Sequence, residues 1–183
     1  LDHPFNPPSL ALGSGATFVA RTIDRDSKHL ASIVKESHTH KGSSFVEIYQ
    51  NCNIFNDGAF ANMTDRETKM ETRLVLEEDQ PMIFGKDRDK GLVLNGSQLS
   101  VLQLSDDKTL DDVLVHNSSD KNMARLLSGM TYNGELPTPV GVIYKEDRPT
   151  YDDMMTAQLQ SAVDSKGHGD LDTLIKGSNT WTV

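Results

Sequence analysis

Cysteine is almost absent from this chain, because Cys52 is the single cysteine among 183 residues. One thiol excludes a disulfide framework within the chain, and it cannot hold a metal cluster without ligands from elsewhere. Long apolar runs are also missing. No segment approaches the roughly 20 residues of a membrane-spanning helix, and no signal-peptide pattern opens the sequence. We therefore expect a cytoplasmic protein that has no membrane partner.

Positive charge is also in short supply. Eighteen lysines and arginines stand against 27 aspartates and glutamates, which gives a formal net charge of −9. Nucleic-acid binding draws much of its affinity from a basic surface, so the composition argues against a nucleic-acid partner. The apolar content of 36% and the charged content of 25% are those of a globular protein.

Residues 1–58 have the pattern of an α/β fold. The runs Ala16–Arg21 and Ser44–Gln50 predict two strands. Between them, apolar residues at helical spacing predict a helix over Ser27–Lys41, with Ser27 as its N-cap. A strand, a helix and a strand in this order predict parallel neighbours joined by a right-handed crossover. Two strands do not make a stable sheet, so we expect more protein to cover them.

Residues 59–183 have the pattern of a mixed α+β carboxyl-terminal extension. The predicted strand segments are Arg73–Glu77, Met82–Phe84, Leu92–Leu94, Ser100–Leu104 and Val140–Tyr144. The predicted helical segments are Thr109–His116, Asp120–Ser128, a helix capped by Thr150 that ends near Gly167, and Asp170–Lys176. The apolar stripe of the helix after Thr150 is expected to lie in a core; it comprises Tyr151, Met154, Met155 and Leu159.

Cys52 follows the second predicted strand, in the run Phe45-Val-Glu-Ile-Tyr-Gln-Asn-Cys-Asn-Ile-Phe-Asn-Asp-Gly58. Ligands and cofactors of α/β proteins gather at the carboxyl ends of strands. Two interpretations stay open at this point. Cys52 is either a small inert thiol, or a ligand whose partner residues lie on a part of the protein outside this chain.

Two other groups of side chains have ordinary explanations. His38 and His40 lie near the end of the predicted helix, where side chains at i and i+2 diverge. We interpret them as a solvated helix end rather than a metal site. Adjacent acidic residues such as Asp152 and Asp153 suit helix starts and solvated turns better than acid–base catalysis.

Three segments of the chain resemble one protein family. The segment Phe5-Asn-Pro-Pro-Ser-Leu-Ala-Leu-Gly-Ser-Gly-Ala-Thr-Phe-Val-Ala-Arg21 resembles a stretch late in the thiamine-diphosphate domain of 2-oxoacid:ferredoxin oxidoreductase β subunits. Cys52 and Ile54-Phe-Asn-Asp-Gly58 continue this match in register. Two further segments resemble the carboxyl-terminal extension of the 2-oxoglutarate type, Arg148-Pro-Thr-Tyr-Asp-Asp153 and Thr180-Trp-Thr-Val183.

The resemblance implies a fold and a reaction. Residues 1–58 would be the carboxyl-terminal part of a thiamine-diphosphate-binding domain with parallel strands, and residues 59–183 its extension. The enzyme would decarboxylate 2-oxoglutarate oxidatively to succinyl-CoA, using thiamine diphosphate, Mg²⁺ and a 4Fe-4S cluster, and would reduce ferredoxin. Cys52 would be a metal ligand, the last one of the cluster. An α subunit would complete the active site, and the 2-oxoacid and CoA would be the substrates.

The resemblance leaves two alternatives. The pyruvate branch of the family usually brackets this cysteine with prolines and follows it with Gly-Trp, so Ile54-Phe-Asn-Asp57 favours the 2-oxoglutarate branch. The family's earlier cysteines and its Gly-Asp-Gly motif do not occur here. We therefore expect the carboxyl-terminal half of a β subunit, colourless and inactive by itself. The rival interpretation is a non-catalytic interaction or regulatory domain related to the family.

Overall fold

The computed structural model describes residues 5–131, 134–178 and 181 of the chain. These residues belong to two compact units, unit 1 up to Arg148 and unit 2 from Pro149. Part of the terminal motif that carries the family resemblance, namely Thr180, Thr182 and Val183, lies outside the described residues. Within those that are described, no helix is long and apolar enough to cross a membrane.

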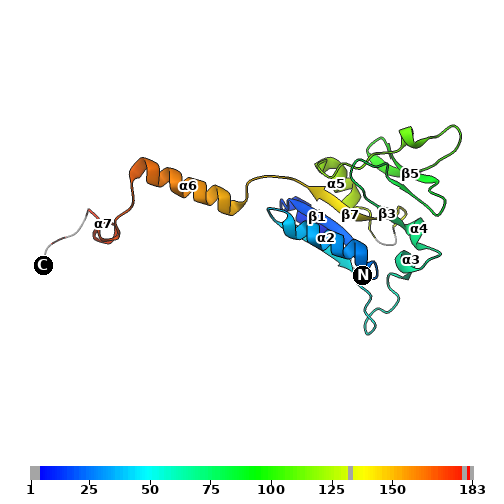
Figure 1. Ribbon diagram of the computed structural model, residues 1–183, viewed down its shortest axis with the longest axis horizontal. Helices are drawn as coiled ribbons and strands as arrows, with labels where there is room; N and C mark the ends of the chain where they lie inside the picture. The colour runs from blue at the N-terminus through cyan, green and yellow to red at the C-terminus, as the bar shows by residue number, and fades with distance from the viewer. Residues whose placement is uncertain (1–4, 132–133, 179–180, 182–183) are drawn as a thin grey trace. The chain divides into compact units, whose positions relative to one another are not determined.

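Unit 1 is built on a four-stranded mixed sheet with the strand order β2-β1-β7-β3 (Figure 1). Strand β1 (Phe18–Ile23) runs parallel to β2 (Ser44–Tyr49), as the sequence predicts. On its other side β1 pairs antiparallel with β7 (Thr138–Lys145), which in turn pairs parallel with β3 (Arg73–Val75). Strands from both sides of residue 58 therefore share one sheet, while the proposed domain boundary at this residue stays a prediction.

Helix α2 (Ser27–Thr39) covers one face of this sheet. Phe18 and Ala20 of β1 pack with Ile33 of this helix in a small buried cluster. The N-cap is Asp26, whose carboxylate accepts a hydrogen bond from the backbone of His29, so the prediction of Ser27 as the cap is wrong by one residue. Aspartate and serine cap equally well, and the sequence pattern alone does not separate two adjacent candidates.

The opposite face of the sheet carries the larger core. Helices α1 (Pro7–Gly13) and α5 (Lys121–Ser128) lie here, together with an antiparallel sheet of β4 (Ile83–Phe84), β5 (Lys90–Asn95) and β6 (Gln98–Gln103). The residues of this core include Leu12, Val19, Phe84, Leu92, Leu127 and Ile143. Because β1 sends alternate side chains to two covered faces, all six of its residues are buried.

The predicted strands Arg73–Glu77 and Met82–Phe84 are present as β3 and β4, which are shorter than predicted and lie in different sheets. The sequence prediction fails at the next segment of the chain. The predicted helix Thr109–His116 is wrong apart from a short 3₁₀ turn, η1 (Leu110–Asp112). The residues after this turn are extended, because Val113 packs against Gly91 and Val115 bridges Pro81. Two short helices complete unit 1: α3 (Ala61–Thr64) and α4 (Lys69–Thr72).

Unit 2 consists of helices α6 (Tyr151–Lys166) and α7 (Leu171–Lys176). Thr150 is the N-cap of α6, as the sequence predicts, and the structure adds the reciprocal hydrogen bond from the Thr150 backbone to the Asp153 side chain that completes a capping box. The apolar stripe of α6 is not buried, since Tyr151, Met154 and Leu159 are exposed. The expectation of a core stripe is wrong here because unit 2 has no second apolar layer among its described residues.

Arg21 is the most unusual residue of the core. Its side chain is 1% exposed, and its Nε donates to Glu47 Oε2 at 2.6 Å across the β1–β2 pair. One terminal nitrogen donates to the carbonyls of Met130 and Pro139 at 3.1 and 3.3 Å. The guanidinium also lies 5.4 Å from the centre of the Tyr49 ring. One buried cation therefore fastens β2, the segment after α5 and the start of β7 to β1.

We expect Arg21→Met to lower the free energy of unfolding of the chain by about 3 kcal/mol, because it leaves Glu47 and two carbonyls without their donor. The matched control is Lys145→Met, which removes the half-exposed pair with Glu36 and should cost less than about 1 kcal/mol. Urea unfolding followed by circular dichroism measures both. Equal losses in the two variants would contradict this account of Arg21.

Candidate functional site

The carboxyl ends of β1 and β2 meet at one edge of the sheet, where ligands of α/β folds gather. Asp24 follows β1, and its Oδ2 accepts from the backbone of Asn51 at 3.0 Å, which ties the start of the Cys52 loop to the end of β1. Asp26 follows on the same side and forms an ion pair with Arg73, the first residue of β3. Loops from three strands are therefore joined by hydrogen bonds at this edge.

The Cys52 loop spans residues 50–60, and its base is closed by aromatic stacking. Tyr49 at the end of β2 and Phe60 before α3 stack with ring centres 4.7 Å apart and planes 6° apart. In Figure 1 this loop projects away from the sheet between β2 and α3. The chain thus leaves and re-enters the fold at one fixed point, which restricts the conformations open to the loop.

Asn51 organises the interior of the loop. Its Nδ2 donates to Asn53 Oδ1 at 2.7 Å and to Asp57 Oδ1 at 2.9 Å, while its Oδ1 accepts from the backbone of Gly58 at 2.8 Å. The side chains of Asn51 and Asn53 therefore bind each other and the loop, and they hold its shape.

The Cys52 thiol is half-buried and faces backbone donors of its own loop. The N–H groups of Phe55, Ile54 and Asn56 hydrogen-bond to the sulfur and lower the pKa of Cys52, whereas burial and the Asp57 carboxylate act in the opposite direction. Cys52 and Asn56 also form an isolated β-bridge, with a backbone hydrogen bond of 3.0 Å. Three amides around one sulfur favour its thiolate form.

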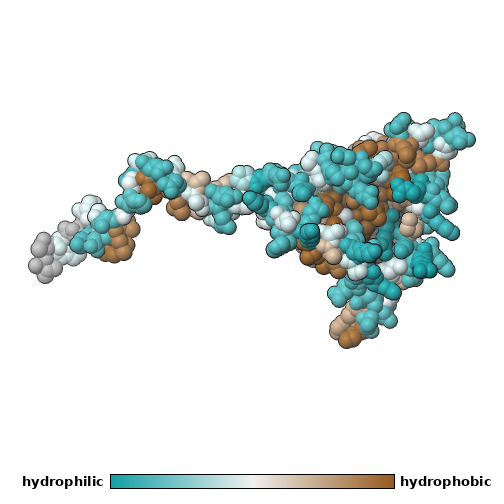
Figure 2. All heavy atoms as spheres, viewed as in Figure 1, coloured by the Kyte–Doolittle hydropathy of each residue, from teal (hydrophilic) through white to brown (hydrophobic). Residues whose placement is uncertain are grey.

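The tip of the loop is apolar and exposed. Ile54 and Phe55 are 85% and 88% exposed, and Figure 2 shows apolar atoms at the end of the segment that projects from unit 1. Within the described residues, no group of three or more histidine, cysteine or acidic side chains could hold a metal ion. Cys52 is therefore brought together with amide donors, the Asp57 carboxylate and apolar neighbours.

The predicted histidine pair has separate environments. His38 is exposed at the end of α2. His40 is not simply exposed to solvent. Its Nε2 lies 2.8 Å from Thr17 Oγ1, and the centre of its ring lies 5.5 Å from the centre of the Phe18 ring. The interpretation of His40 as a freely solvated residue is therefore wrong, because it joins α2 to the start of β1.

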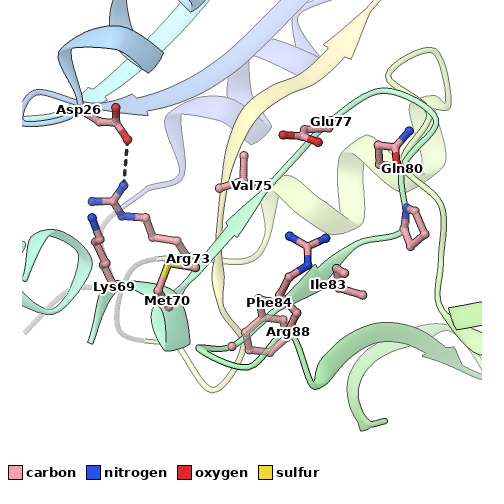
Figure 3. A pocket seen from close by; sticks show the side chains of 12 residues that line it. Asp26, Lys69, Met70, Arg73, Val75, Glu77, Gln80, Ile83, Phe84 and Arg88 are labelled. Carbon is pink, nitrogen blue, oxygen red and sulfur yellow. Dashed lines mark hydrogen bonds and ion pairs between the residues drawn. The ribbon is translucent and has the colours of Figure 1, made fainter. Parts of the chain in front are cut away.

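A pocket of about 260 Å³ lies beside β3, between α4 and the turn that precedes β5. Figure 3 shows its lining side chains, with the Asp26–Arg73 ion pair at one end. Three cationic residues line it: Lys69 of α4, Arg73 of β3 and Arg88 of the turn. Asp26 and Glu77 are the acidic residues of the lining, and Met70, Val75, Ile83 and Phe84 supply apolar surface.

Sequence reasoning missed this pocket. Its cations lie on three different elements, and Arg88 belongs to the charged turn Lys86-Asp-Arg-Asp-Lys-Gly91, which by itself predicts only exposure. The three cations converge because β3 pairs with β7 and β4 pairs with β5, which places β3 and β4 in different sheets. No local signal in the sequence carries that pairing.

The chain was compared with protein families and with known proteins, and no family model matches. The 2-oxoglutarate oxidoreductase subunit KorB of Mycobacterium tuberculosis is 37% identical over 188 residues, covering 100% of this chain and 50% of the relative. A 2-oxoacid:ferredoxin oxidoreductase subunit beta of Saccharolobus solfataricus is 42% identical over 57 residues, covering 31% of this chain and 19% of the relative. The resemblance to this β-subunit family is confirmed.

A solved structure supports the fold assignment. The 2-oxoglutarate:ferredoxin oxidoreductase from Magnetococcus marinus, with 2-oxoglutarate, coenzyme A and succinyl-CoA bound, matches with a TM-score of 0.62 at 20% identity. The match covers 98% of this chain and 46% of that chain. The predicted α/β fold class with a parallel strand pair is confirmed. This chain spans about half the length of the β-subunit relative that it matches over its whole length.

Because Cys52 is the single cysteine, alkylation of the chain reports on one thiol. We expect the pH midpoint of its reaction with iodoacetamide to lie below that of the same thiol in the urea-unfolded chain, since the loop amides stabilise the thiolate. Asn51→Ala should move the midpoint back upward, because the amides lose their fixed direction. Asn95→Ala, at the exposed end of β5, serves as the control. Identical midpoints in the folded and unfolded chain would contradict this prediction.

Proposed function

We propose that this chain is the carboxyl-terminal half of the β subunit of a 2-oxoglutarate:ferredoxin oxidoreductase, and that Cys52 is a ligand of its 4Fe-4S cluster. The observation that carries the proposal is the thiol itself. Within a chain similar over its whole length to such a β subunit, the single cysteine lies at the end of a parallel strand, and backbone amides lower its pKa.

The surroundings of Cys52 suit a cluster ligand. Iron–sulfur clusters bind through thiolates, and hydrogen bonds to the sulfurs tune their potentials. The amides of Ile54, Phe55 and Asn56 already donate to the sulfur, so the thiolate is favoured before any metal binds. The thiol is half-exposed, which leaves room for ligands from another part of the protein. The exposed Ile54 and Phe55 would shield the cluster from water once that part is in place.

Most of the cofactor chemistry would lie outside these residues. In the complete enzyme, bound thiamine diphosphate with Mg²⁺ would supply an electron sink for decarboxylation, and a 4Fe-4S cluster would supply single-electron transfer toward ferredoxin. This sequence has no Gly-Asp-Gly motif, so we assign none of its residues to the diphosphate or the magnesium. The role left to this chain is to hold the cluster through Cys52, to order the thiol loop through Asn51, and to contact the rest of the enzyme.

The substrate assignment rests on two observations. The relative matched over the whole chain has a name that specifies 2-oxoglutarate, and the sequel Ile54-Phe-Asn-Asp57 lacks the prolines and the Gly-Trp of the pyruvate branch. We therefore propose 2-oxoglutarate and CoA as substrates, a cytoplasmic location, and ferredoxin and an α subunit as partners. A non-catalytic domain derived from the family is the alternative, and it predicts that Cys52 can be replaced without loss of electron transfer.

Cys52→Ser in the assembled enzyme should spare folding and abolish most of the 2-oxoglutarate-dependent reduction of ferredoxin. Serine is nearly isosteric, yet its hydroxyl is a poor iron ligand at neutral pH. Ferredoxin reduction, iron content and the electron paramagnetic resonance spectrum measure the effect. Asn95→Ser, at the exposed end of β5, leaves the thiol and its loop intact and should retain the cluster signal. Normal turnover with an unchanged spectrum in Cys52→Ser would favour the non-catalytic alternative.

Unit 2 supports the proposal of a partner subunit. Leu171, Leu174 and Ile175 have the i, i+3, i+4 spacing of one helix face and are 68%, 78% and 73% exposed. We expect their joint replacement by serine to weaken co-purification with the α subunit, while the unfolding transition of unit 1 stays unchanged. Replacing the polar Asp172 and Lys176 by serine is the control. Undiminished co-purification of the apolar triple variant would argue against unit 2 as a subunit contact.

A further inference from the structure

We infer that the pocket beside β3 binds a small amphipathic anion, an oxyanion head group such as phosphate or carboxylate carried on a short apolar stem. The inference rests on the pocket's own residues and not on the proposed role of Cys52, which is not part of its lining. The cations of the pocket have unused hydrogen-bond donors, an apolar surface lies beside them, and Asp26 and Arg73 bring one end of the pocket to the edge where β1 and β2 end.

Two of the cations are available to a ligand. In the described part of the chain, the side chains of Lys69 and Arg88 form no ion pair or hydrogen bond. Arg88 also has a backbone φ of +54°. Residues other than glycine adopt this left-handed conformation at a free-energy cost of about 1 kcal/mol. This conformation occurs in the turn after Gly85, and Figure 3 shows the Arg88 guanidinium among the side chains that line the pocket, between Val75 and Ile83 in this view.

Arg73 supplies a rigid third cation. Its side chain is 11% exposed and is held twice, by the carbonyl of Met63 and by Asp26 Oδ2 at 3.2 Å. A guanidinium has five N–H donors in a planar fork, so these two contacts leave donors unused at the pocket. Burial lowers the pKa of Arg73, and Asp26 counters that effect. Because this guanidinium is already fixed, its side chain loses little conformational entropy when it binds a planar or tetrahedral oxyanion.

The apolar part of the pocket explains why the ligand should have a stem. Ile83 and Phe84 belong to β4, which packs on the larger core, and Met70 of α4 is 45% exposed beside them. A bare inorganic anion would leave this surface in contact with water. A short alkyl or similar stem would cover it and gain from the removal of apolar area from water.

The acidic residues set the selectivity of the pocket. Asp26 is already engaged by Arg73 and by the backbone of His29. Glu77 has no ion pair among the described residues, and its charge opposes an anion. The three cations and two carboxylates leave one net positive charge in a chain of net charge −9. Removal of the Glu77 charge should therefore strengthen anion binding, whereas removal of a cation should weaken it.

The experiment is calorimetric titration of the full chain with four probes: n-butyl phosphate, butanoate, inorganic phosphate and n-butanol. We expect one saturable site in which butyl phosphate or butanoate binds more tightly than inorganic phosphate, and butanol does not bind. The stronger of the two stemmed anions identifies the head group. Affinity should fall as the salt concentration rises, because salt screens charge attraction.

The variants make the location of the site testable. Arg88→Gln should weaken binding about tenfold, the size of one charge-assisted hydrogen bond, and Glu77→Gln should strengthen it. Lys86→Gln is the matched control, since Lys86 is exposed in the same turn and does not line the pocket. All three residues lie outside the cores, so folding should be unaffected. No saturable binding, butanol binding equal to that of butyl phosphate, or equal affinity in Arg88→Gln would overturn the inference.

Discussion

The buried ion pair between Arg21 and Glu47 is the contact on which the sheet of unit 1 depends. A guanidinium that is 1% exposed is expensive to bury unless its donors are used. Arg21 uses them on Glu47 of β2, on the carbonyls of Met130 and Pro139, and against the ring of Tyr49. These contacts lie on three segments, namely β2, the residues after α5 and the start of β7, so the energy that solvates the cation also holds these segments against β1.

The same cation reaches the Cys52 loop through Tyr49. Arg21 lies against one end of a short chain of contacts in which Tyr49 stacks on Phe60 and closes the loop base. Above that base, Asn51 bonds to Asp57 and to the amide of Gly58. The direction of the amides around the thiol is therefore set from the core outward. A thiol on an unconstrained loop would lose those donors to water, and its pKa would return to the ordinary value.

The parts predicted from the sequence are those in which local pattern decides the structure. Apolar runs give β1 and β2, and the helix between them makes a parallel pair almost unavoidable. The start of α6 follows from Thr150 after Pro149, and Thr150 is its N-cap. Pattern fails where a distant segment decides. Val113 lies in a segment whose apolar spacing predicts a helix, but the segment is extended and Val113 packs against Gly91. Helix α6 has an apolar stripe typical of a core, but no other part of the described chain covers it.

The two candidate sites show why net charge is a poor guide to ligands. A chain of net charge −9 argues against anionic partners on average, yet electrostatic attraction acts over about 8–10 Å at moderate salt. Within that range, Cys52 has three backbone donors, and the pocket beside β3 has three cations against two carboxylates. Both arrangements favour negative charge: a thiolate in one and a bound oxyanion in the other. Both also depend on strand ends that the sheet brings to one edge, so the topology, more than the composition, determines where an anion is stable.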